Sequence, residues 1–481
     1  MNKKDNKVVD SIFWVGIGSL LSRVFSILTT LILAKLLTPN DFGIISIAIL
    51  FSSTLGLFRD IGLNQSLIYQ KKDVHKAADT AMIMSIALSI FLYGVAYLLS
   101  APTAIFFNSP PVEDVIKVLP VTLIISAFSS IPSSLLEKEM DFKKRALPEL
   151  ASFFTYFVVT ITTAKLGFSY WSIIIGLISH SFVNLVVTFI VSPWHPTLKF
   201  HPEVVYDLLS FGKYAMFSTI VIFIYRNVDD FALGKILGMK LLGFYTLAYR
   251  ISNMTTTQIT NMISKVTYPA FVKISNDIDK VREFYLNTFR WLSIVNIPIT
   301  IGIISLAPHF FHIFYGNKWN AAIVPTQILA LFGLIRGLFF PGGLFMSMGK
   351  IKETTYLNTG QLIVFLLLIY PTILKFGIVG LCILMLTLQL VLALIFISRI
   401  ELFLPNTKNR YIGLLAPPLL ISLVTIALPI NGWIVVFGKL NLISFLGLIA
   451  LTGLFYLFVI IKWNKEILDE IKSFIKVLKG Q

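Results

Sequence analysis

The sequence predicts an all-α integral membrane protein of about fourteen transmembrane helices, with two pseudo-symmetric six-helix lobes followed by two C-terminal helices. Three observations lead to this prediction: a strongly apolar composition, long apolar runs that recur along the chain, and a short internal repeat. Of the 481 residues, 56% are hydrophobic and only 13% are charged, and the mean hydropathy is +0.83. Soluble domains carry about 25% charged residues, so lipid is expected to surround most of the chain.

The apolar runs have the length and continuity of transmembrane helices. In hydrocarbon every backbone polar group must be hydrogen-bonded within the protein, and roughly 20 apolar residues cross a bilayer as a helix. The runs lack the short alternating pattern of barrel strands. The predicted spans are residues 12–36, 42–64, 78–101, 114–136, 148–166, 169–191, 209–233, 242–263, 289–311, 323–347, 355–375, 377–399, 411–430 and 441–462.

The distribution of basic residues predicts the orientation of these spans. Most of the 40 lysines and arginines fall in alternate segments between the predicted helices. Segments rich in lysine and arginine stay in the cytoplasm, so both termini are predicted to be cytoplasmic. The formal net charge of +16 is therefore interpreted as an orientation signal toward the anionic leaflet, and nucleic-acid binding is not expected.

A short repeat relates the two halves of the chain. The segment Leu33-Ala-Lys-Leu-Leu-Thr-Pro-Asn-Asp-Phe-Gly-Ile-Ile-Ser-Ile-Ala48 aligns without a gap with Leu233-Gly-Lys-Ile-Leu-Gly-Met-Lys-Leu-Leu-Gly-Phe-Tyr-Thr-Leu-Ala248, and five positions are identical. Each copy falls at the turn between the first two helices of a half. Six helices, an even number, separate the copies, so the halves are predicted to point the same way about an axis along the membrane normal.

The repeat also suggests the domain organisation. Residues 1–200 are predicted to form the first lobe and residues 201–400 the second, with the cargo route between them. Residues 401–481 add two helices and a cytoplasmic tail whose apolar residues fall on one stripe, which is typical of an interfacial amphipathic helix.

Charged residues at apparent membrane depth are the candidate functional residues, because a charge in hydrocarbon costs at least ~2.5 kcal/mol and normally faces protein or a water-filled cavity. Ser19, Arg23, Ser26 and Thr30 share one face of the first span. This stripe predicts either a hydrogen-bonded helix contact or the lining of a hydrophilic cavity.

The acidic residues are candidates for coupling transport to a proton or another cation. Arg226, Asp229 and Asp230 lie within about one helical turn, close enough to pair with one another. They form either an internal ion cluster or, with Asp60, part of a coupling site.

The remaining arginines are candidate cargo contacts. Arg59 lies near the cytoplasmic end of its span and can also reach the interface. Arg250 and Arg336 lie deeper, and a guanidinium group there suits a phosphate, which it can bind through two parallel N–H groups.

Pro341, Gly342 and Gly343 form a predicted hinge, because they interrupt the helical pattern of residues 323–347. The freed backbone groups are tolerated where protein or water satisfies them. No Walker lysine motif and no recognised metal-binding set occurs in the sequence, so no cofactor and no metal are expected.

The chain resembles the Wzx-type polysaccharide exporters of the multidrug/oligosaccharidyl-lipid/polysaccharide (MOP) superfamily, especially the branch similar to colanic-acid exporters. The residues that carry this resemblance are Leu33-Ala-Lys-Leu-Leu-Thr-Pro-Asn-Asp-Phe-Gly43, Leu136-Glu-Lys-Glu-Met-Asp-Phe-Lys143, Gly167-Phe-Ser-Tyr-Trp-Ser172, Asp229-Asp-Phe-Ala-Leu-Gly234, Gly243-Phe-Tyr-Thr-Leu-Ala-Tyr-Arg250 and Tyr315-Gly-Asn-Lys-Trp319.

The resemblance implies two lobes around a central cationic cavity, alternating access, and a location in a bacterial inner membrane. The residues predicted to supply the positive charge of this cavity are Arg23, Arg226, Arg250 and Arg336. It implies a flippase whose cargo is an undecaprenyl-diphosphate-linked oligosaccharide, handed to a polysaccharide polymerase or ligase, with H⁺ or Na⁺ as a possible coupling ion. Two alternatives stay open. A cation-coupled drug antiporter like those of the MATE family would favour an acidic cavity, and a membrane-embedded glycan-processing enzyme would favour a large external loop.

Overall fold

The computed structural model describes residues 18, 21–22, 24–60, 62–70, 72–139, 141–197, 199–339, 342–438 and 440–463. All regular structure in this part of the chain is helical, which confirms the predicted all-α class. The chain divides into two compact units, Met1–Thr246 and Leu247–Gln481, and each is described by itself. The lobe boundaries predicted near residues 200 and 400 stay a prediction.

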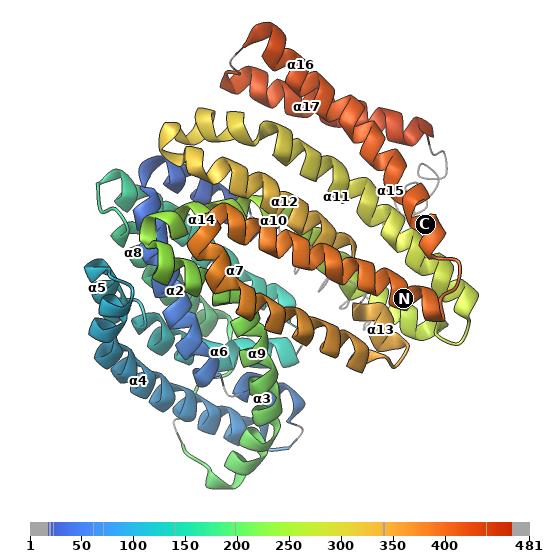
Figure 1. Cartoon of the computed structure of the whole chain (residues 1–481). Helices are drawn as coiled ribbons and strands as arrows, with labels where there is room; N and C mark the ends of the chain where they lie inside the picture. Colours follow the sequence, from blue (N-terminus) through green and yellow to red (C-terminus); the bar gives the residue numbers. More distant parts are fainter. Residues whose placement is uncertain are drawn as a thin grey trace. The chain divides into compact units, whose positions relative to one another are not determined.

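The first unit contains the short apolar helix Val24–Leu36. Its further elements are labelled in Figure 1 where there is room: α2 (Pro39–Arg59), α3 (Leu63–Tyr69), α4 (Val74–Phe106), α5 (Pro110–Val118), α6 (Val121–Lys138), α7 (Phe142–Lys165), α8 (Trp171–Val191), η1 (Pro202–Val204), α9 (Val205–Leu237) and the first turns of α10 (Met239–Ile274).

The first repeat segment contains the residues that cap the start of α2. Thr38 is the N-cap: its Oγ1 accepts a hydrogen bond from the Asp41 N–H, and Asp41 Oδ2 accepts one from the Thr38 N–H at 2.8 Å. This reciprocal capping box satisfies two of the N–H groups that a helix leaves open. The other carboxylate oxygen of Asp41 accepts a 2.6 Å hydrogen bond from Ser169 Oγ, so the cap also fixes the turn between α7 and α8.

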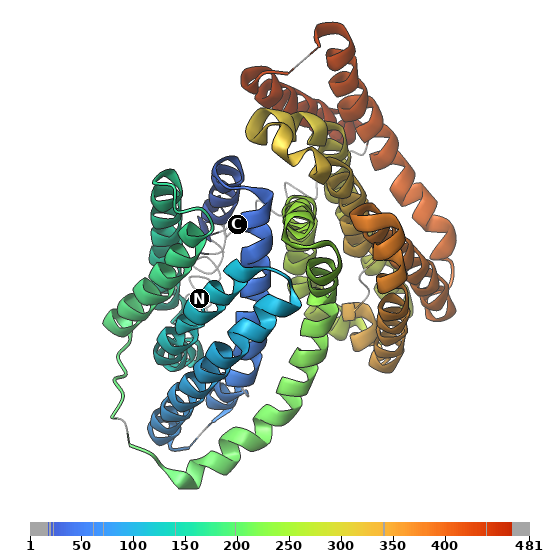
Figure 2. The same ribbon diagram turned by 60° about the vertical axis from the view of Figure 1, so that its left-hand side comes forward.

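Two further contacts hold the first unit together. Gly176 of α8 lies so close to α7 that a Cβ built on it would be 1.8 Å from Thr160 Oγ1, as expected where small residues let membrane helices approach. Apart from η1, the described residues that connect α8 to α9 have no regular structure (Figure 2). The buried Asp79 of α4 anchors this connection, since its carboxylate accepts hydrogen bonds from Thr197 N at 2.9 Å and Thr197 Oγ1 at 2.5 Å.

The second unit contains the rest of α10 and the C-terminal helices. Its further elements are α11 (Ile278–Tyr315), η2 (Asn317–Ala322), α12 (Ile323–Leu338), α13 (Gly342–Ser347), α14 (Ile351–Phe403), α15 (Lys408–Ser422), the π-helical segment η3 (Leu423–Ala427), α16 (Leu428–Phe437) and α17 (Leu442–Trp463).

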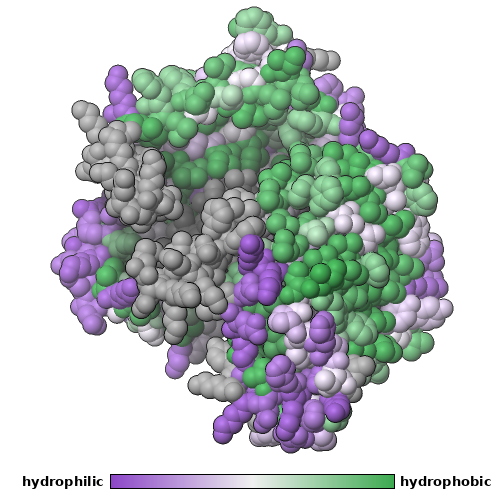
Figure 3. Space-filling view, turned by 180° about the vertical axis from the view of Figure 1, so that it is seen from behind, coloured by the Kyte–Doolittle hydropathy of each residue, from purple (hydrophilic) through white to green (hydrophobic). Residues whose placement is uncertain are grey.

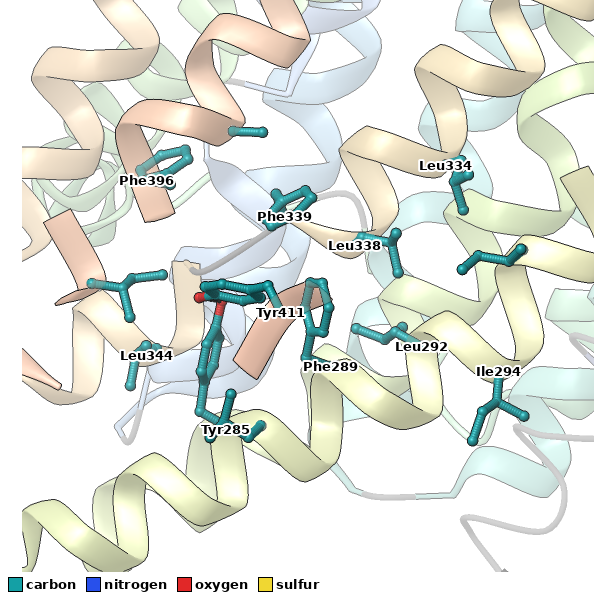
Figure 4. Close-up of a cluster of buried hydrophobic side chains, with 14 of the residues drawn as sticks. Tyr285, Phe289, Leu292, Ile294, Leu334, Leu338, Phe339, Leu344, Phe396 and Tyr411 are labelled. Carbon is teal, nitrogen blue, oxygen red and sulfur yellow. Dashed lines mark hydrogen bonds between the residues drawn. The ribbon is translucent and has the colours of Figure 1, made fainter. Parts of the chain in front are cut away.

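The last two predicted spans pack against α11, beside which Figure 1 shows them in orange and red. The hydroxyl of Tyr411 on α15 lies 3.0 Å from that of Tyr285 on α11, within the apolar cluster drawn in Figure 4. On α17, Tyr456 donates a 2.8 Å hydrogen bond to the Ile294 carbonyl oxygen. The additional helices are therefore fixed to the second unit by packing and by buried hydrogen bonds.

Ten helices in the described part of the chain are long and apolar enough to cross a membrane. The predicted spans 355–375 and 377–399 both lie in α14, where Gly377 interrupts the helix with φ of 60°, a conformation that glycine adopts without strain. Helices α9 and α10 cover the predicted seventh and eighth spans but are not among the ten. The total of fourteen stays a prediction.

The surface of the helices fits a lipid environment. Leu98 on α4 is 76% exposed and Val435 on α16 is 84% exposed. Figure 3 shows broad hydrophobic areas, with hydrophilic residues gathered mainly toward the edges of that face. Exposed apolar areas of this extent are rare on soluble monomers, so lipid is the solvent that these faces require.

Candidate functional site

The polar stripe predicted on the first span is described only in part. Ser19 and Arg23 lie outside the described residues. Ser26 and Thr30 are half-buried on the helix Val24–Leu36, and Thr30 Oγ1 donates a 2.9 Å hydrogen bond to the Ser26 carbonyl oxygen. A hydroxyl group that bonds to its own helix remains compatible with a cavity lining. The role assigned to this stripe stays a prediction.

Arg59 and Asp60 lie at the C-terminal end of α2 and contact neighbouring elements of the first unit. Arg59 Nη1 donates a 3.2 Å hydrogen bond to the Leu123 carbonyl oxygen and another to Ser126 Oγ on α6. Asp60 accepts a 2.8 Å hydrogen bond from Asn64 on α3. These contacts join α2, α3 and α6. Both charged groups therefore stabilise the packing of these helices.

The acidic cluster of α9 contacts the first turns of α10. Asp229 is buried, and its Oδ2 accepts a hydrogen bond from the hydroxyl of Tyr245, which is also buried. Asp230 is half-buried, and Arg226 is exposed. The structure thus brings a tyrosine to Asp229 that sequence spacing could not reveal. Pairing of Arg226 with the two carboxylates inside the helix stays a prediction.

The second unit places two predicted cargo contacts on adjacent helices. Arg250 is exposed on α10, and Arg336 is half-buried on α12. The two helices are joined by a 2.8 Å hydrogen bond from Ser252 Oγ to the Thr326 carbonyl oxygen.

Arg336 is held by neutral groups. Its Nη1 lies 3.2 Å from the Tyr249 hydroxyl oxygen, and its guanidinium carbon lies 5.9 Å from the centroid of the Phe332 ring. Among the described residues, Arg336 forms no ion pair with a carboxylate. Its charge is therefore oriented by the protein but is not neutralised by an acidic side chain of the described chain, and a guanidinium in this condition can bind an anion.

An apolar cavity of about 730 Å³ lies in the same unit, between α11, η3 and α17. Its lining is almost entirely hydrocarbon, and the hydroxyl of Tyr456 in its wall is hydrogen-bonded to the Ile294 carbonyl oxygen. Residues that line it include Trp291, Pro298, Gly302, Leu306, Gly453 and Ile460. A cavity of this kind accepts hydrocarbon chains and rejects charged groups.

The predicted hinge coincides with an interruption between α12 and α13. Helix α12 ends at Leu338 and α13 begins at Gly342, whereas Pro341 lies outside the described residues. A Cβ built on Gly343 would meet Tyr268 of α10 at 3.5 Å, which is ordinary van der Waals contact. Motion at this break stays a prediction. No group of three potential metal ligands occurs among the described residues.

A family model described as "Polysaccharide biosynthesis protein" matches residues 32–324, which is more than half of the chain. The chain belongs to this family. A similar relative is the lipopolysaccharide biosynthesis protein WzxC of Escherichia coli, which is 24% identical over 90% of this chain and 89% of its own length.

Solved structures show the same fold. The lipid II flippase MurJ in an inward closed conformation has a TM-score of 0.71 at 16% identity, covering 95% of this chain and all of MurJ. An inward-facing MATE multidrug transporter of the MOP superfamily has a TM-score of 0.58 at 15% identity, covering 82% of this chain and 99% of its own.

These comparisons confirm the resemblance to polysaccharide exporters and the MOP fold. With its many apolar helices the chain is a multi-pass membrane protein, and the names of the relatives agree with a transporter rather than an enzyme. Sequence reasoning missed Tyr245, Tyr249 and Ser126, the partners of the charged groups. These residues lie on two helices, α6 and α10, and no spacing rule within one helix connects them to the charges that they contact.

Proposed function

We propose that this protein is a flippase of polysaccharide biosynthesis. It moves an undecaprenyl-diphosphate-linked oligosaccharide across a bacterial inner membrane by alternating access, and it delivers this cargo to a polymerase or ligase on the other side. The family assignment supports the pathway, and the likeness to MurJ and MATE supports a fold that suits such a cycle.

The observation on which the proposal rests is that Arg336 is held by neutral groups and forms no ion pair with a carboxylate among the described residues. A flippase breaks no bond of its cargo. Its task is to offer a polar path to a headgroup that would otherwise lose its hydration in hydrocarbon. A diphosphate needs cationic donors that are oriented but not neutralised, and Arg336 meets this requirement through Tyr249 and Phe332. Arg250 on the neighbouring helix is the second proposed contact, and Arg23 extends the proposed cationic path in the first lobe.

The apolar cavity supports a cargo with a long hydrocarbon tail. A polyprenyl tail in the bilayer is already in hydrocarbon, so its entry into a cavity of about 730 Å³ lined by Pro298, Leu306 and Ile460 is favoured by close packing and not by removal from water. The headgroup and the tail thus require opposite environments. The second unit provides an arginine on α12 and a hydrocarbon cavity beside α11.

Asp229 is the proposed coupling residue for H⁺ or Na⁺. Its carboxylate is buried against Tyr245, and a buried carboxylate that gains or loses a cation changes the stability of the contact that it forms. Because α9 and the start of α10 meet at this contact, ion binding there would alter how firmly the two helices are held.

The decisive experiment is deletion of the gene followed by analysis of lipid-linked intermediates. The proposal expects undecaprenyl-linked oligosaccharides to build up in the cytoplasmic leaflet and the surface glycan to disappear, with both restored by the wild-type gene. Normal surface glycan without build-up would refute it. Drug sensitivity with normal glycan would indicate the MATE-like antiporter, and intermediates of altered sugar structure would indicate a glycan-processing enzyme.

A further inference from the structure

Helix α11 contains two prolines in its interior, Pro298 and Pro308. Proline has no backbone N–H, so each of them removes the hydrogen bond that a helix makes to the carbonyl group four residues earlier. The carbonyl groups that lose this bond are those of Ile294 and Ile304. In a membrane such a group needs another donor from the protein or from water.

Both carbonyl groups accept a hydrogen bond from a side chain of another helix. The Tyr456 hydroxyl on α17 donates to the Ile294 carbonyl oxygen at 2.8 Å. Nε2 of Gln327 on α12 donates to the Ile304 carbonyl oxygen at 2.9 Å. We call the first set of residues the tyrosine latch (Ile294, Pro298 and Tyr456) and the second the glutamine latch (Ile304, Pro308 and Gln327). Both latches lie within the second unit.

The two latches differ in their relation to the apolar cavity. All three residues of the tyrosine latch line the cavity, and none of the glutamine latch does. Gly302, which lies between the two prolines, also lines the cavity, and a Cβ built on it meets no atom within 4 Å. Proline and glycine both weaken a helix interior. The stiffness of α11 beside the cavity therefore depends on a residue of the cavity wall, Tyr456.

The closed tyrosine latch keeps the cavity wall apolar. Tyr456 is only 4% exposed, and its hydroxyl is bonded to the Ile294 carbonyl oxygen, so the two groups satisfy each other. If the latch opened, both groups would lie beside the cavity, where water can solvate them and a hydrocarbon chain cannot. A polyprenyl tail thus binds the closed latch more tightly than the open one, and by linkage it stabilises the closed latch by the same factor.

We propose that the tyrosine latch is an occupancy sensor for the apolar cavity. A polyprenyl tail in the cavity keeps the latch closed, and departure of the tail allows α11 to bend at Pro298. The identity of the tail rests on the proposed function. Tyr456 is a positioning residue that acts through the Ile294 carbonyl group, whereas the glutamine latch holds α11 to α12 whether or not the cavity is filled.

The first test measures binding of undecaprenol, which carries the tail without a phosphate and so isolates the cavity from the headgroup site. Tyr456→Phe keeps the ring but removes the donor. It is expected to weaken binding roughly fivefold, which corresponds to the net contribution of one hydrogen bond. Tyr411→Phe is the matched control, because it removes a buried hydroxyl that contacts the Tyr285 hydroxyl and no carbonyl beside a proline. Equal losses in the two variants would refute the proposal.

A double-mutant cycle identifies the atom through which Tyr456 acts. Pro298→Ala supplies the missing N–H, so the Ile294 carbonyl group is then satisfied inside its own helix. In the Pro298→Ala background, Tyr456→Phe is therefore expected to cause no further loss of undecaprenol binding. A full fivefold loss in that background would show that Tyr456 acts through another contact, and the sensor would be wrong.

The second test measures the bending of α11 without relying on transport. The protein carries Cys382→Ala, which removes the natural cysteine. Spin labels on the exposed positions Asn287→Cys and Phe458→Cys report the part of α11 before Pro298 against α17. Labels on His312→Cys and Ile443→Cys report the part after Pro308 against the same helix. Each labelled protein is studied in phospholipid nanodiscs with and without undecaprenol.

The first label pair is expected to show a broad or double distance distribution in phospholipid alone and a narrow one with undecaprenol. The second pair should not change. Tyr456→Phe should keep the first distribution broad under both conditions, and Pro298→Ala should keep it narrow under both. The tyrosine latch thus predicts opposite effects for two variants of the same contact, which a general loss of stability does not produce.

A first distribution that is equally narrow without undecaprenol, or equally broad with it, would overturn the sensor. If the gene deletion leaves the surface glycan normal while the distances respond to undecaprenol as expected, the proposed function fails and the sensor stands. If the deletion causes build-up of lipid-linked intermediates while the distances ignore undecaprenol, the sensor fails and the proposed function stands.

Discussion

The guanidinium of Arg336 and the hydroxyl of Tyr249 form a hydrogen bond between α12 and α10, with 3.2 Å between donor and acceptor. A phenol is a neutral partner, so it fixes the direction of the arginine without neutralising its charge. This differs from an ion pair such as that of Arg410 with Glu283, where the two charged groups lie 2.6 Å apart. The difference separates an arginine that can bind an anion from one that is already paired.

Arg336→Ala is expected to weaken binding of undecaprenyl diphosphate roughly ten- to hundredfold, because a hydrogen bond to a charged group contributes about 1.5–3 kcal/mol. Arg336→Lys keeps the charge but loses the planar fork, so its loss should be smaller. Tyr249→Phe should have the weakest effect of the three. Binding to purified protein and restoration of surface glycan in the deletion strain are the two measurements.

Arg410→Ala is the control for the Arg336 series, since it removes an arginine from an exposed ion pair that contributes little. It should bind and export like the wild type. Equal binding by the Arg336→Ala protein and the control would show that this arginine is not a cargo contact.

Arg59→Ala is expected to act on stability and not on cargo affinity, because its guanidinium joins α2 to the Leu123 carbonyl oxygen and to Ser126 of α6. Loss of these contacts should lower the free energy of unfolding by about 1.5–3 kcal/mol. The apparent Tm in detergent and the amount of protein in the membrane check this. Weakened binding of undecaprenyl diphosphate at unchanged Tm would instead restore Arg59 as a cargo contact.

The sequence predicted the helices well because each span needs about 20 apolar residues, and even the division of α14 near Gly377 could be placed from composition. The repeat indicated that Gly43 and Gly243 occupy equivalent positions. It did not indicate that a Cβ on Gly43 would lie 1.8 Å from the Met239 carbonyl oxygen, because a short identity says nothing about which atoms meet.

The partners of the buried charges could not be predicted from the sequence. Asp229 accepts a hydrogen bond from Tyr245, which lies sixteen residues away across a turn. Arg59 donates one to Ser126, which lies on a helix that is distant in the chain. The apolar cavity could not be predicted from the sequence either. A lipid-facing residue and a cavity-lining residue such as Leu306 are both apolar, so hydrophobic periodicity does not distinguish them in a membrane protein.

Asp229→Asn is expected to uncouple transport from its driving ion. The amide keeps the size of the side chain and can still bond to Tyr245, but it cannot bind H⁺ or hold Na⁺ as a carboxylate does. Flipping in proteoliposomes should continue at a lower rate that no longer responds to an imposed H⁺ or Na⁺ gradient. Asp230→Asn serves as the comparison, because its carboxylate is only half-buried. A gradient response that persists in Asp229→Asn and disappears in Asp230→Asn would assign coupling to the other carboxylate.

Filling the apolar cavity is expected to impair recognition of the lipid tail while leaving the headgroup site intact. Gly453 lines the cavity, and a Cβ built on it meets no atom within 4 Å, so Gly453→Leu has room for its side chain and should also favour the helix. Wild-type protein should bind undecaprenyl diphosphate more tightly than a short-chain prenyl diphosphate, and Gly453→Leu should reduce this preference. Gly447→Leu on the same helix is the matched control, because Gly447 is also open to a Cβ but does not line the cavity. If Gly453→Leu and Gly447→Leu preserve the same preference for the long chain, the tail binds elsewhere and the cavity has no part in cargo recognition.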